Sequence, residues 1–364
     1  MTRRRAAIIG AGMGGASLAA ELAATDEVIL IEAESQPGFH ATGRSAAFWS
    51  ETYGGPLVQP LTTASGPFLH APPPEFAPRG FLRTRGELLL ARDPSVLAAM
   101  AAEFAATGVP IAWRDPHGVI DGLRGQWHAL WSPGCADIDV GALHAAYLAK
   151  ARRGGVELRC DARVTGAQRT DGRWMLKTAA GDIIAADVVV NAAGAWADDV
   201  AVLLGAAPQG IRPYRRTVVQ VRVDPPAPAD LPLVMDAAGG FYFKPEPGGR
   251  LWLTPHDETP DRPHDVAPEE IDVALAIDRF EAAVDWRVEA VERRWAGLRS
   301  FAPDRLPVYG FDAAVPGFFW CAGQGGFGIQ TAPAAAQLCA ALLGVGKVPQ
   351  GVDATAYSPH RLSE

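Results

Sequence analysis

The sequence of 364 residues contains few cysteines and no pattern of residues typical of a metal site. The four cysteines, Cys135, Cys160, Cys321 and Cys339, lack CxxC spacing, and the eight histidines form no cluster with the spacing of metal ligands. These absences argue against a disulfide-stabilised secreted domain and against zinc binding. We expect buried free thiols, which suit the reducing cytoplasm, and no bound metal.

Long hydrophobic runs and an excess of positive charge are also absent. No apolar stretch reaches the ~18 uncharged residues of a membrane-spanning helix, which leaves only peripheral membrane contact open. The net charge of -8 argues against nucleic acid as a partner. The basic run Thr2–Arg5 precedes apolar residues, as in a signal peptide. That stretch contains glycines and continues into Glu21 and Asp26, so we expect a cytoplasmic protein.

The N-terminal segment has the pattern of a dinucleotide-binding unit. Ile8–Glu32 reads as a strand, a glycine turn, an alanine-rich helix, a second strand and an acid. Gly10 suits the tight turn, Gly12 lets a pyrophosphate approach the backbone, and Gly15 lets the helix pack closely on the strand. Glu32 is placed to accept hydrogen bonds from a ribose diol.

Two later segments indicate which dinucleotide binds. Asp187–Trp196 is a buried strand that runs into a glycine turn, and Gly317–Thr331 repeats this plan before an alanine-rich helix. Three separated units favour FAD over a nicotinamide cofactor. The glycines from Gly323 to Gly328 would place backbone N–H groups beside the flavin ring.

The remaining pattern predicts two interleaved domains. With 48% hydrophobic and 20% charged residues, the chain can bury a large core. The fold class that we expect is α/β, a Rossmann-like FAD-binding domain of the glutathione-reductase type with an antiparallel-sheet α+β substrate domain. Strand-like runs at 218–223, 241–243 and 251–253 and a helix at 268–280 belong to the latter. The FAD-binding domain comprises residues 1–78, 140–208 and 300–364, and the substrate domain comprises 79–139 and 209–299.

The chain resembles the D-amino acid oxidase superfamily of flavoproteins. Within it, the chain is most similar to the bacterial FAD-dependent D-arginine dehydrogenases, nearly end to end. Cys321 does not match the cysteine that carries flavin in sarcosine oxidases, so the resemblance implies non-covalent FAD. The strings WAGLRS and QGGFGIQT are its most specific elements; the full set is Gly10–Gly15, Glu32, Pro37–Ala47, Val190–Trp196, Trp295–Phe301, Gln324–Thr331 and Ser358–Ser363.

The resemblance also implies a set of FAD contacts. His40 is either a contact to the flavin or a residue beside it. The implied contacts are Gly10, Gly12, Met13, Gly14, Gly15, Glu32, Ala33, His40, Thr42, Gly43, Arg44, Ser45, Ala47, Val164, Ala193, Gly194, Trp196, Arg299, Gly325, Gly326, Phe327, Gly328, Ile329, Gln330 and Thr331.

Oxidation of an α-amino acid by hydride transfer needs a fixed carboxylate, a neutral amine and a Cα–H aimed at the flavin. Arg299 resembles the arginine that binds the substrate carboxylate through two parallel hydrogen bonds. Arg216 matches a second substrate-contacting arginine, and Tyr53 and Tyr242 match the phenols that close over the carboxylate. Gly326 would offer its carbonyl to the amine. For each side chain the alternative is an ordinary structural role.

Glu87 matches the carboxylate that reaches a cationic substrate side chain. Its alternative role is a solvated acid at a strand end, paired with Arg83 or Arg85. Phe48 departs from the family, because a histidine stands there in D-arginine dehydrogenase and a phenyl ring makes the amine environment drier. The substrate-binding set that we expect is Phe48, Ser50, Glu87, Gly326 and Gln330, with Tyr53, Arg216, Tyr242 and Arg299 as catalytic residues.

The function predicted from this resemblance is FAD-dependent oxidative deamination of D-amino acids. The imino acid product hydrolyses to a 2-oxo acid and ammonia, and the electrons pass to a quinone, a dye or oxygen. Two alternatives stay open. A relative of this superfamily could oxidise a 2-hydroxy acid with the same arginines, or the chain could be a non-catalytic flavoprotein.

Overall fold

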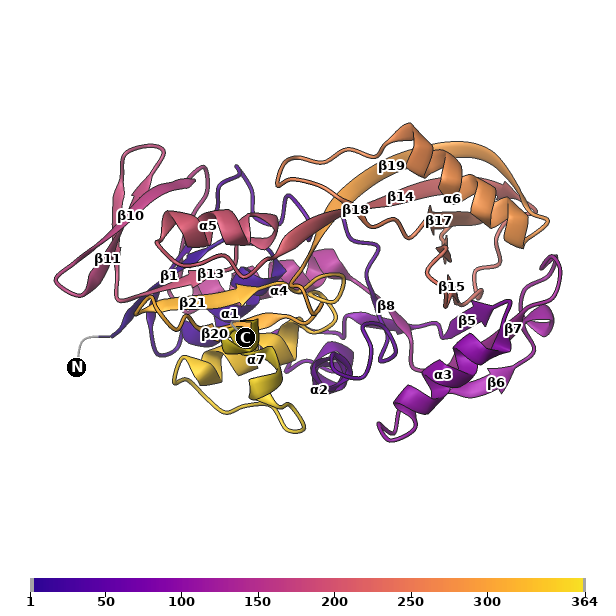
Figure 1. Ribbon diagram of the computed structural model, residues 1–364, viewed down its shortest axis with the longest axis horizontal. Helices are drawn as coiled ribbons and strands as arrows, with labels where there is room; N and C mark the ends of the chain where they lie inside the picture. The colour runs from indigo at the N-terminus through magenta and orange to yellow at the C-terminus, as the bar shows by residue number, and fades with distance from the viewer. Residues whose placement is uncertain (1–2, 363–364) are drawn as a thin grey trace.

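The structure, a computed structural model, describes residues 3–362. Two large sheets lie toward opposite ends of an elongated molecule (Figure 1). The first has six strands in the order β20-β21-β13-β1-β2-β9, all parallel except for the edge strand β20. Its strands are β1 (Arg5–Ile9), β2 (Glu27–Ile31), β9 (Glu157–Arg159), β13 (Val188–Asn191), β20 (Val308–Phe311) and β21 (Phe318–Ala322).

Helices and a small sheet cover the two faces of this parallel sheet. Near-continuous apolar runs in the central strands allow burial on both sides. Side chains of α1, α4 and α7 form a core on one face, while α5 and a three-stranded sheet pack on the other. These elements are α1 (Met13–Leu22), α2 (Gln59–His70), α4 (Val140–Arg153), α5 (Ala197–Leu203), α7 (Ala332–Leu342), β10 (Val164–Thr170), β11 (Arg173–Thr178) and β12 (Ile183–Ala186).

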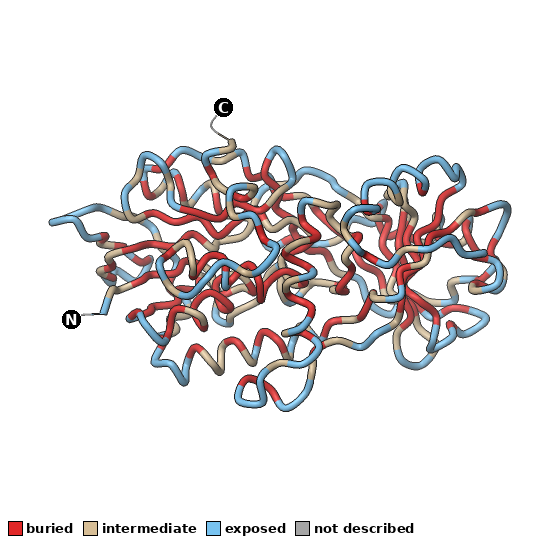
Figure 2. The backbone as a smooth tube through the Cα atoms, turned by 90° about the horizontal axis from the view of Figure 1, so that it is seen from below, coloured by how far each residue is buried: buried red, intermediate tan, exposed pale blue. Residues whose placement is uncertain are grey.

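The second large sheet has nine strands and carries α6 on one face. Its backbone is buried between exposed loops (Figure 2). The long pair β14 and β19 extends from this sheet toward the parallel one (Figure 1). Its elements are β5 (Glu87–Ala91), α3 (Pro94–Phe104), β6 (Ala112–Arg114), β7 (His128–Ser132), β14 (Arg212–Asp224), β15 (Leu233–Asp236), β16 (Tyr242–Glu246), β17 (Arg250–Thr254), β18 (Thr259–Pro260), α6 (Glu270–Ala283) and β19 (Arg287–Phe301).

The fold class agrees with the sequence-based expectation, with one difference in detail. The nine-stranded sheet is not wholly antiparallel, because β5 pairs in parallel with β15. Parallel neighbours need a crossover connection, and here the chain passes through the other half of the molecule between these two strands. The predicted strands at 218–223 and 251–253 lie within β14 and β17, the one at 241–243 overlaps β16, and the predicted helix at 268–280 overlaps α6.

A fourth, short sheet links segments on either side of residue 78. Its order is β3-β8-β4, with β3 at Phe48–Trp49, β4 at Leu82–Thr84 and β8 at Ala136–Ile138. Since β3 precedes residue 78 and its partner β8 follows it, backbone pairing crosses the predicted boundary. The division into domains stays a prediction.

Candidate active site

A cavity of about 460 Å³ opens at the carboxyl ends of β1, β2 and β13, where α/β sheets bind their ligands. It brings together predicted FAD contacts from all three glycine-rich units. Those that line it are Gly10, Gly12, Met13, Gly14, Glu32, Ala33, His40, Thr42, Arg44, Ser45, Val164, Ala193, Gly194, Trp196, Arg299, Gly325, Gly326, Gly328 and Ile329.

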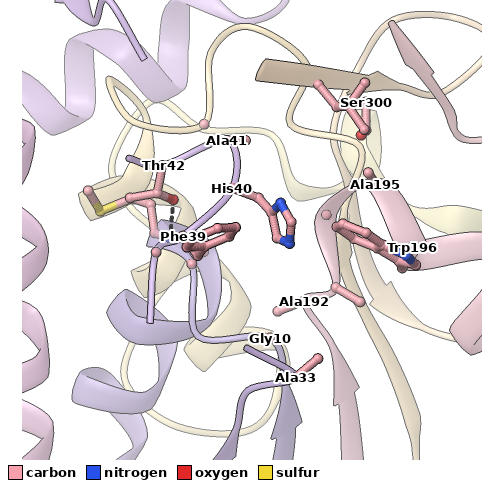
Figure 3. A pocket seen from close by; sticks show the side chains of 18 of the residues that line it. Gly10, Ala33, Phe39, His40, Ala41, Thr42, Ala192, Ala195, Trp196 and Ser300 are labelled. Atoms are coloured by element: carbon pink, nitrogen blue, oxygen red, sulfur yellow. Dashed lines mark hydrogen bonds between the residues drawn. The ribbon is translucent and has the colours of Figure 1, made fainter. Parts of the chain in front are cut away.

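The first glycine turn holds the N-terminus of α1 against this cavity. Gly10 has φ +104, and a Cβ there would lie 2.3 Å from the carbonyl oxygen of Ala192. Gly12 precedes α1, which has no side-chain N-cap, and Met13 N donates to Thr42 Oγ1 at 2.9 Å (Figure 3). A helix N-terminus without a cap, facing a cavity, suits the phosphates of a dinucleotide.

Glu32 lies at the end of β2 and lines the same cavity. Its Oε2 accepts from Ala11 N at 2.9 Å, and its Oε1 accepts from Glu34 N at 3.1 Å. Each carboxylate oxygen has two lone pairs, so these bonds orient the group and leave acceptor capacity for ribose hydroxyls.

His40 projects into the cavity near Trp196 (Figure 3). The two ring centroids are 4.6 Å apart, and His40 Nε2 lies 3.1 Å from Glu34 Oε1. Because the ring is part of the cavity wall, His40 stays a predicted cofactor contact.

Six predicted FAD contacts do not line the large cavity. Gly15 lies behind the turn, where a Cβ would come 1.9 Å from Gly10 O. Gly43 N donates to Gly38 O, and Thr331 Oγ1 donates to Phe327 O, so these residues shape the loops. The full set is Gly15, Gly43, Ala47, Phe327, Gln330 and Thr331, of which Ala47 and Gln330 line a neighbouring cavity.

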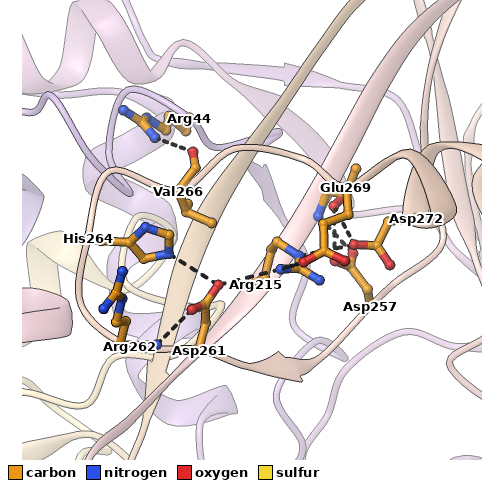
Figure 4. A network of polar contacts seen from close by, with 10 residues as sticks. Arg44, Arg215, Asp257, Asp261, Arg262, His264, Val266, Glu269 and Asp272 are labelled. Carbon is orange, nitrogen blue, oxygen red and sulfur yellow. Dashed lines mark hydrogen bonds and ion pairs between the residues drawn. The ribbon is translucent and has the colours of Figure 1, made fainter.

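Residues 264–266, here called the strap, reach the cofactor cavity from the half of the molecule that holds the nine-stranded sheet. No sequence pattern predicted this contact. His264 and Val266 line the cavity. Arg44 Nη1 donates to Val266 O at 2.9 Å (Figure 4), and Arg44 also pairs with Asp265. A polar loop of this kind carries no local signal, because only folding brings it to the glycine-rich half.

A smaller cavity of about 20 Å³ adjoins the first and shares Ser45, Arg299, Gly326 and Ile329 with it. It gathers predicted substrate residues from both halves of the molecule. Its lining is Ser45, Ala46, Ala47, Phe48, Tyr53, Arg216, Tyr242, Arg299, Gly326, Ile329 and Gln330.

Arg299 is the cation shared by both cavities. Its residue is 7% exposed, and its guanidinium has no hydrogen-bond or ion-pair partner within residues 3–362. Burial and then the charge of Arg216 lower the pKa of Arg299. Burial raises the pKa of the Tyr242 phenol to about 12, so that group remains a neutral donor. A buried cation without a counter-ion is costly, and an anionic ligand would relieve that cost.

Arg216 is also buried but already has partners. Its Nε donates to Asp257 O at 2.7 Å, its Nη2 to Glu258 at 3.0 Å, and its Nη1 lies 3.5 Å from the Tyr53 hydroxyl. Of the two arginines, Arg299 is therefore the one left open for a ligand.

Glu87 corrects one alternative from the sequence. It is fully buried rather than solvated, and Arg85 pairs with Asp137 instead. Glu87 Oε2 accepts from Ser50 Oγ at 2.7 Å and from Thr52 Oγ1 at 3.0 Å, while Oε1 has no hydrogen-bond partner among residues 3–362. Burial raises the pKa of Glu87 despite these bonds.

Glu87 and Ser50 stand behind the small cavity and not in its wall. Along β5, residue 87 shares a face with Leu89, which belongs to the apolar cluster of Phe48 and Tyr242. Glu87 therefore approaches the site from the face that carries Phe48.

His256 was not singled out from the sequence. Its ring centroid lies 5.6 Å from that of Tyr242 and 6.4 Å from that of Tyr53. Burial, then the charges of Arg216 and Arg305, lower the pKa of His256 to about 3, so the imidazole is neutral.

Three of the four cysteines are buried as expected, whereas Cys160 is partly exposed. Cys321 lies beneath the third glycine loop, with its Sγ 4.0 Å from that of Cys339, and does not line the cofactor cavity. Within residues 3–362, no helix is long and apolar enough to cross a membrane, and no three His, Cys, Asp or Glu residues gather as metal ligands.

Residues 5–342 match the family described as DAO, FAD dependent oxidoreductase. The chain belongs to this family. FAD is accordingly its cofactor, and the uncapped turn at Gly12 and the orientation of Glu32 fit that group.

Individual relatives agree with the family. Mouse mitochondrial dimethylglycine dehydrogenase is 29% identical over 223 residues, which covers 55% of this chain and 25% of that protein. The chain thus spans about a quarter of the length of that relative. Glycine oxidase of Pseudomonas putida is 28% identical over 284 residues, covering 74% of this chain and 69% of the enzyme.

Solved structures share the whole fold. Glycine oxidase from Geobacillus kaustophilus has a TM-score of 0.83 at 24% identity, with 98% of each chain covered. L-proline dehydrogenase from P. horikoshii has a TM-score of 0.86 at 23% identity, covering 100% of this chain and 98% of that one. At these identities the similarity establishes the fold.

Proposed function

We propose that the protein oxidises a free α-amino acid, a D-amino acid by its resemblance to D-arginine dehydrogenase, and yields an imino acid. The observation that carries this proposal is Arg299, a buried guanidinium without a partner among the described residues, where the two cavities meet. A substrate carboxylate supplies the missing counter-ion and two parallel acceptors. The glycine oxidases among the relatives are consistent with an amino acid substrate.

Bound FAD supplies the hydride acceptor. Arg299 fixes the carboxylate, and Tyr242 and Tyr53, which line the same cavity, donate hydrogen bonds to it from their hydroxyls. The Gly326 carbonyl is available to the amine, while Phe48 excludes water and so favours the neutral amine. The substrate loses a hydride from Cα and a proton from nitrogen, and water converts the imino acid to a 2-oxo acid and ammonia.

The side chain that we propose is cationic, as in D-arginine or D-lysine. Glu87 Oε1 is buried without a partner, and a cation next to it would provide one and keep the carboxylate ionised. Phe48, Tyr53 and Tyr242 add an apolar wall that also suits D-methionine or D-phenylalanine. The same Glu87 disfavours a neutral or anionic 2-hydroxy acid.

A second candidate is a small amino acid such as glycine or an N-methylated glycine. The substrate cavity is only about 20 Å³, which is room for roughly one water by the same measure. Phe48 is part of the wall of this cavity, and the smallest substrates need the least rearrangement of it.

Anaerobic mixing of the FAD-loaded protein with D-arginine, D-methionine, D-phenylalanine, glycine, sarcosine, L-amino acids and 2-hydroxy acids tests the proposal. We expect loss of flavin absorbance with D-amino acids, fastest for cationic ones. Reduction by glycine and sarcosine alone would favour the second candidate. No reduction by any amino acid would leave a non-catalytic flavoprotein.

Glu87→Leu separates the side-chain preference from the reaction. We expect the D-arginine efficiency to fall more than roughly tenfold, because a buried charge pair contributes a few kcal/mol, while D-methionine changes little. Glu103→Leu, an exposed position on α3, is the matched control. An equal loss for both substrates would assign Glu87 a structural role.

We also infer that FAD is held without a covalent bond, that the protein works in the cytoplasm, and that the electron acceptor is a quinone, a dye or oxygen. Aerobic peroxide release measured against dye reduction distinguishes these acceptors.

A further inference from the structure

Glu258 is a carboxylate that pairs with Arg216 and has no role in the proposed reaction. Glu258 Oε1 accepts from Arg216 Nη2 at 3.0 Å and from Arg305 Nη2 at 2.7 Å, and Oε2 accepts from Arg305 Nη2 at 2.9 Å. Arg216 belongs to the nine-stranded sheet, whereas Arg305 lies in the loop between β19 and β20. Glu258 therefore joins the substrate cavity to a loop that enters the parallel sheet.

An irregular turn in the sheet holds Glu258 in this place. β17 ends at Thr254 and β18 begins at Thr259, so the edge of β14 that faces these two strands has no strand partner at Arg216 and Thr217, while β19 pairs with the opposite edge. Asp257 replaces that partner, since its Oδ1 accepts from Thr217 N at 2.7 Å. The same residue offers its carbonyl to Arg216, and Glu258 follows directly.

The charged side chains around the small cavity leave one buried cation, Arg299, for an anionic group of the ligand. Arg216 and Arg299 are both buried cations, and Glu258 neutralises the first of them. Asp257 accepts hydrogen bonds from Thr217, and Glu87 accepts from Ser50 and Thr52, so neither carboxylate pairs with Arg299. Arg305 is 48% exposed at its side chain, so solvent screens its charge. Within residues 3–362, Arg299 is then the buried guanidinium of the small cavity that no carboxylate pairs.

We propose that Glu258 is a specificity-determining residue that occupies Arg216 and so restricts the site to ligands with one carboxylate. This deepens the proposed function, on which it rests for the identity of the substrate carboxylate. A second acidic group brought by a ligand would meet Glu258 and find no free cation. A dicarboxylic amino acid is the class of substrate excluded in this way.

Binding of acetate and malonate to the FAD-loaded protein, followed by the flavin absorbance spectrum, tests the proposal without turnover. In the unmodified protein we expect acetate to bind at least about tenfold more tightly than malonate, a difference of about 1.4 kcal/mol. In Glu258→Gln the ratio should fall toward one or reverse, because Arg216 becomes available. Glu289→Gln is the control. It removes an exposed ion-pair partner of Arg222, which lies on β14 as Arg216 does, and it should retain the original ratio.

A double variant separates the effect of these charges on ligand binding from any effect on folding. Arg216→Met with Glu258→Met removes both charges of this pair, in which the Arg216 side chain is 2% exposed and the Glu258 side chain 34% exposed, so no buried charge is left without its partner. Only Arg299 then faces the ligand, so the preference for acetate should return. Equal binding of acetate and malonate by the unmodified protein would overturn the proposal. An unchanged ratio in Glu258→Gln, or a double variant that keeps the altered ratio, would do the same.

Turnover gives a separate readout. If the unmodified protein oxidises D-alanine, Glu258→Gln should raise the efficiency ratio of D-aspartate to D-alanine at least about tenfold. If no amino acid reduces the flavin, the proposed function fails while the acetate and malonate comparison still decides the role of Glu258.

Discussion

Single side chains in the small cavity differ mainly in whether they already have partners. Arg216 is held by Asp257 and Glu258, whereas Arg299 has no partner in the described part of the chain. This difference follows from position, since Arg299 lies where the two cavities meet and Arg216 faces a polar turn. Charge without a counter-ion is the feature of the site that most needs a ligand.

Arg299→Ala should raise the substrate concentration needed for half-maximal flavin reduction by about 10- to 150-fold, because a charge-assisted contact contributes roughly 1.5–3 kcal/mol. FAD should remain bound. Rapid-mixing measurements at several substrate concentrations check this. Arg293→Ala, an exposed residue on the same strand, is the control. Unchanged kinetics in Arg299→Ala would show that the carboxylate is held elsewhere.

His256 predicts a pH dependence of stability. Its pKa is lowered from 6.5 to about 3, so the folded protein keeps it neutral. Below about pH 6.5 the unfolded chain takes up a proton that the folded chain does not, and the free energy of unfolding falls as the pH drops toward 3. Urea unfolding of His256→Gln between these pH values should show a shallower decline. His360→Gln, an exposed site, should match the unmodified protein, and an equal decline in all three would contradict the prediction.

At the scale of elements, the glycine turns set how closely helix and strand approach. Gly15 brings α1 against Gly10, and the predicted spacing of these glycines needed no tertiary information. The strap containing His264 and Val266 behaves differently. Nothing local marks it, because Arg44 contacts it across more than two hundred residues of sequence.

Gly15→Ala should lower the free energy of unfolding by at least about 2 kcal/mol, because the added methyl group overlaps a backbone carbonyl that cannot move independently. The relevant approach is 1.9 Å to Gly10 O. Chemical denaturation measures the effect. Gly118→Ala, where nothing lies within 4 Å, should change stability by less than about 0.5 kcal/mol. Equal stability of the two variants would show that α1 can shift outward.

At the scale of the whole molecule, the predicted FAD contacts that line the large cavity come from three distant parts of the chain, so we expect cofactor binding and folding to be coupled. A ligand that binds only the folded state raises stability by about 2.7 kcal/mol at a hundredfold excess over its Kd. Cys321 is buried beneath the loop and outside the cavity lining. The geometry therefore gives no reason to expect attachment through that thiol.

We expect acid precipitation to release all of the flavin into the supernatant and the apoprotein to melt several degrees lower than the FAD-loaded protein. Absorbance of the supernatant and thermal melting with and without added FAD measure this. Riboflavin, which lacks the pyrophosphate that suits the N-terminus of α1, is the control and should restore little stability. Flavin that remained with the pellet would contradict non-covalent binding.

The sequence by itself determined the family, the cofactor and the fold class. Its signals are local strings in which glycine is needed for steric reasons, at Gly10 and Gly15 above all, and such strings are legible before folding. The predicted substrate residues Arg299 and Tyr242 could be named through resemblance, and both line the small cavity.

Only the tertiary structure decided which charges meet. Glu87 was expected either at the substrate or in solvent, and its burial against Ser50 and Thr52 excludes the solvated alternative. The sequence indicated no role for Glu258. The gap between β17 and β18 along β14 brings it to Arg216. Burial and pairing depend on contacts between segments far apart in the chain, and these contacts fix the electrostatics of the site where local sequence patterns cannot.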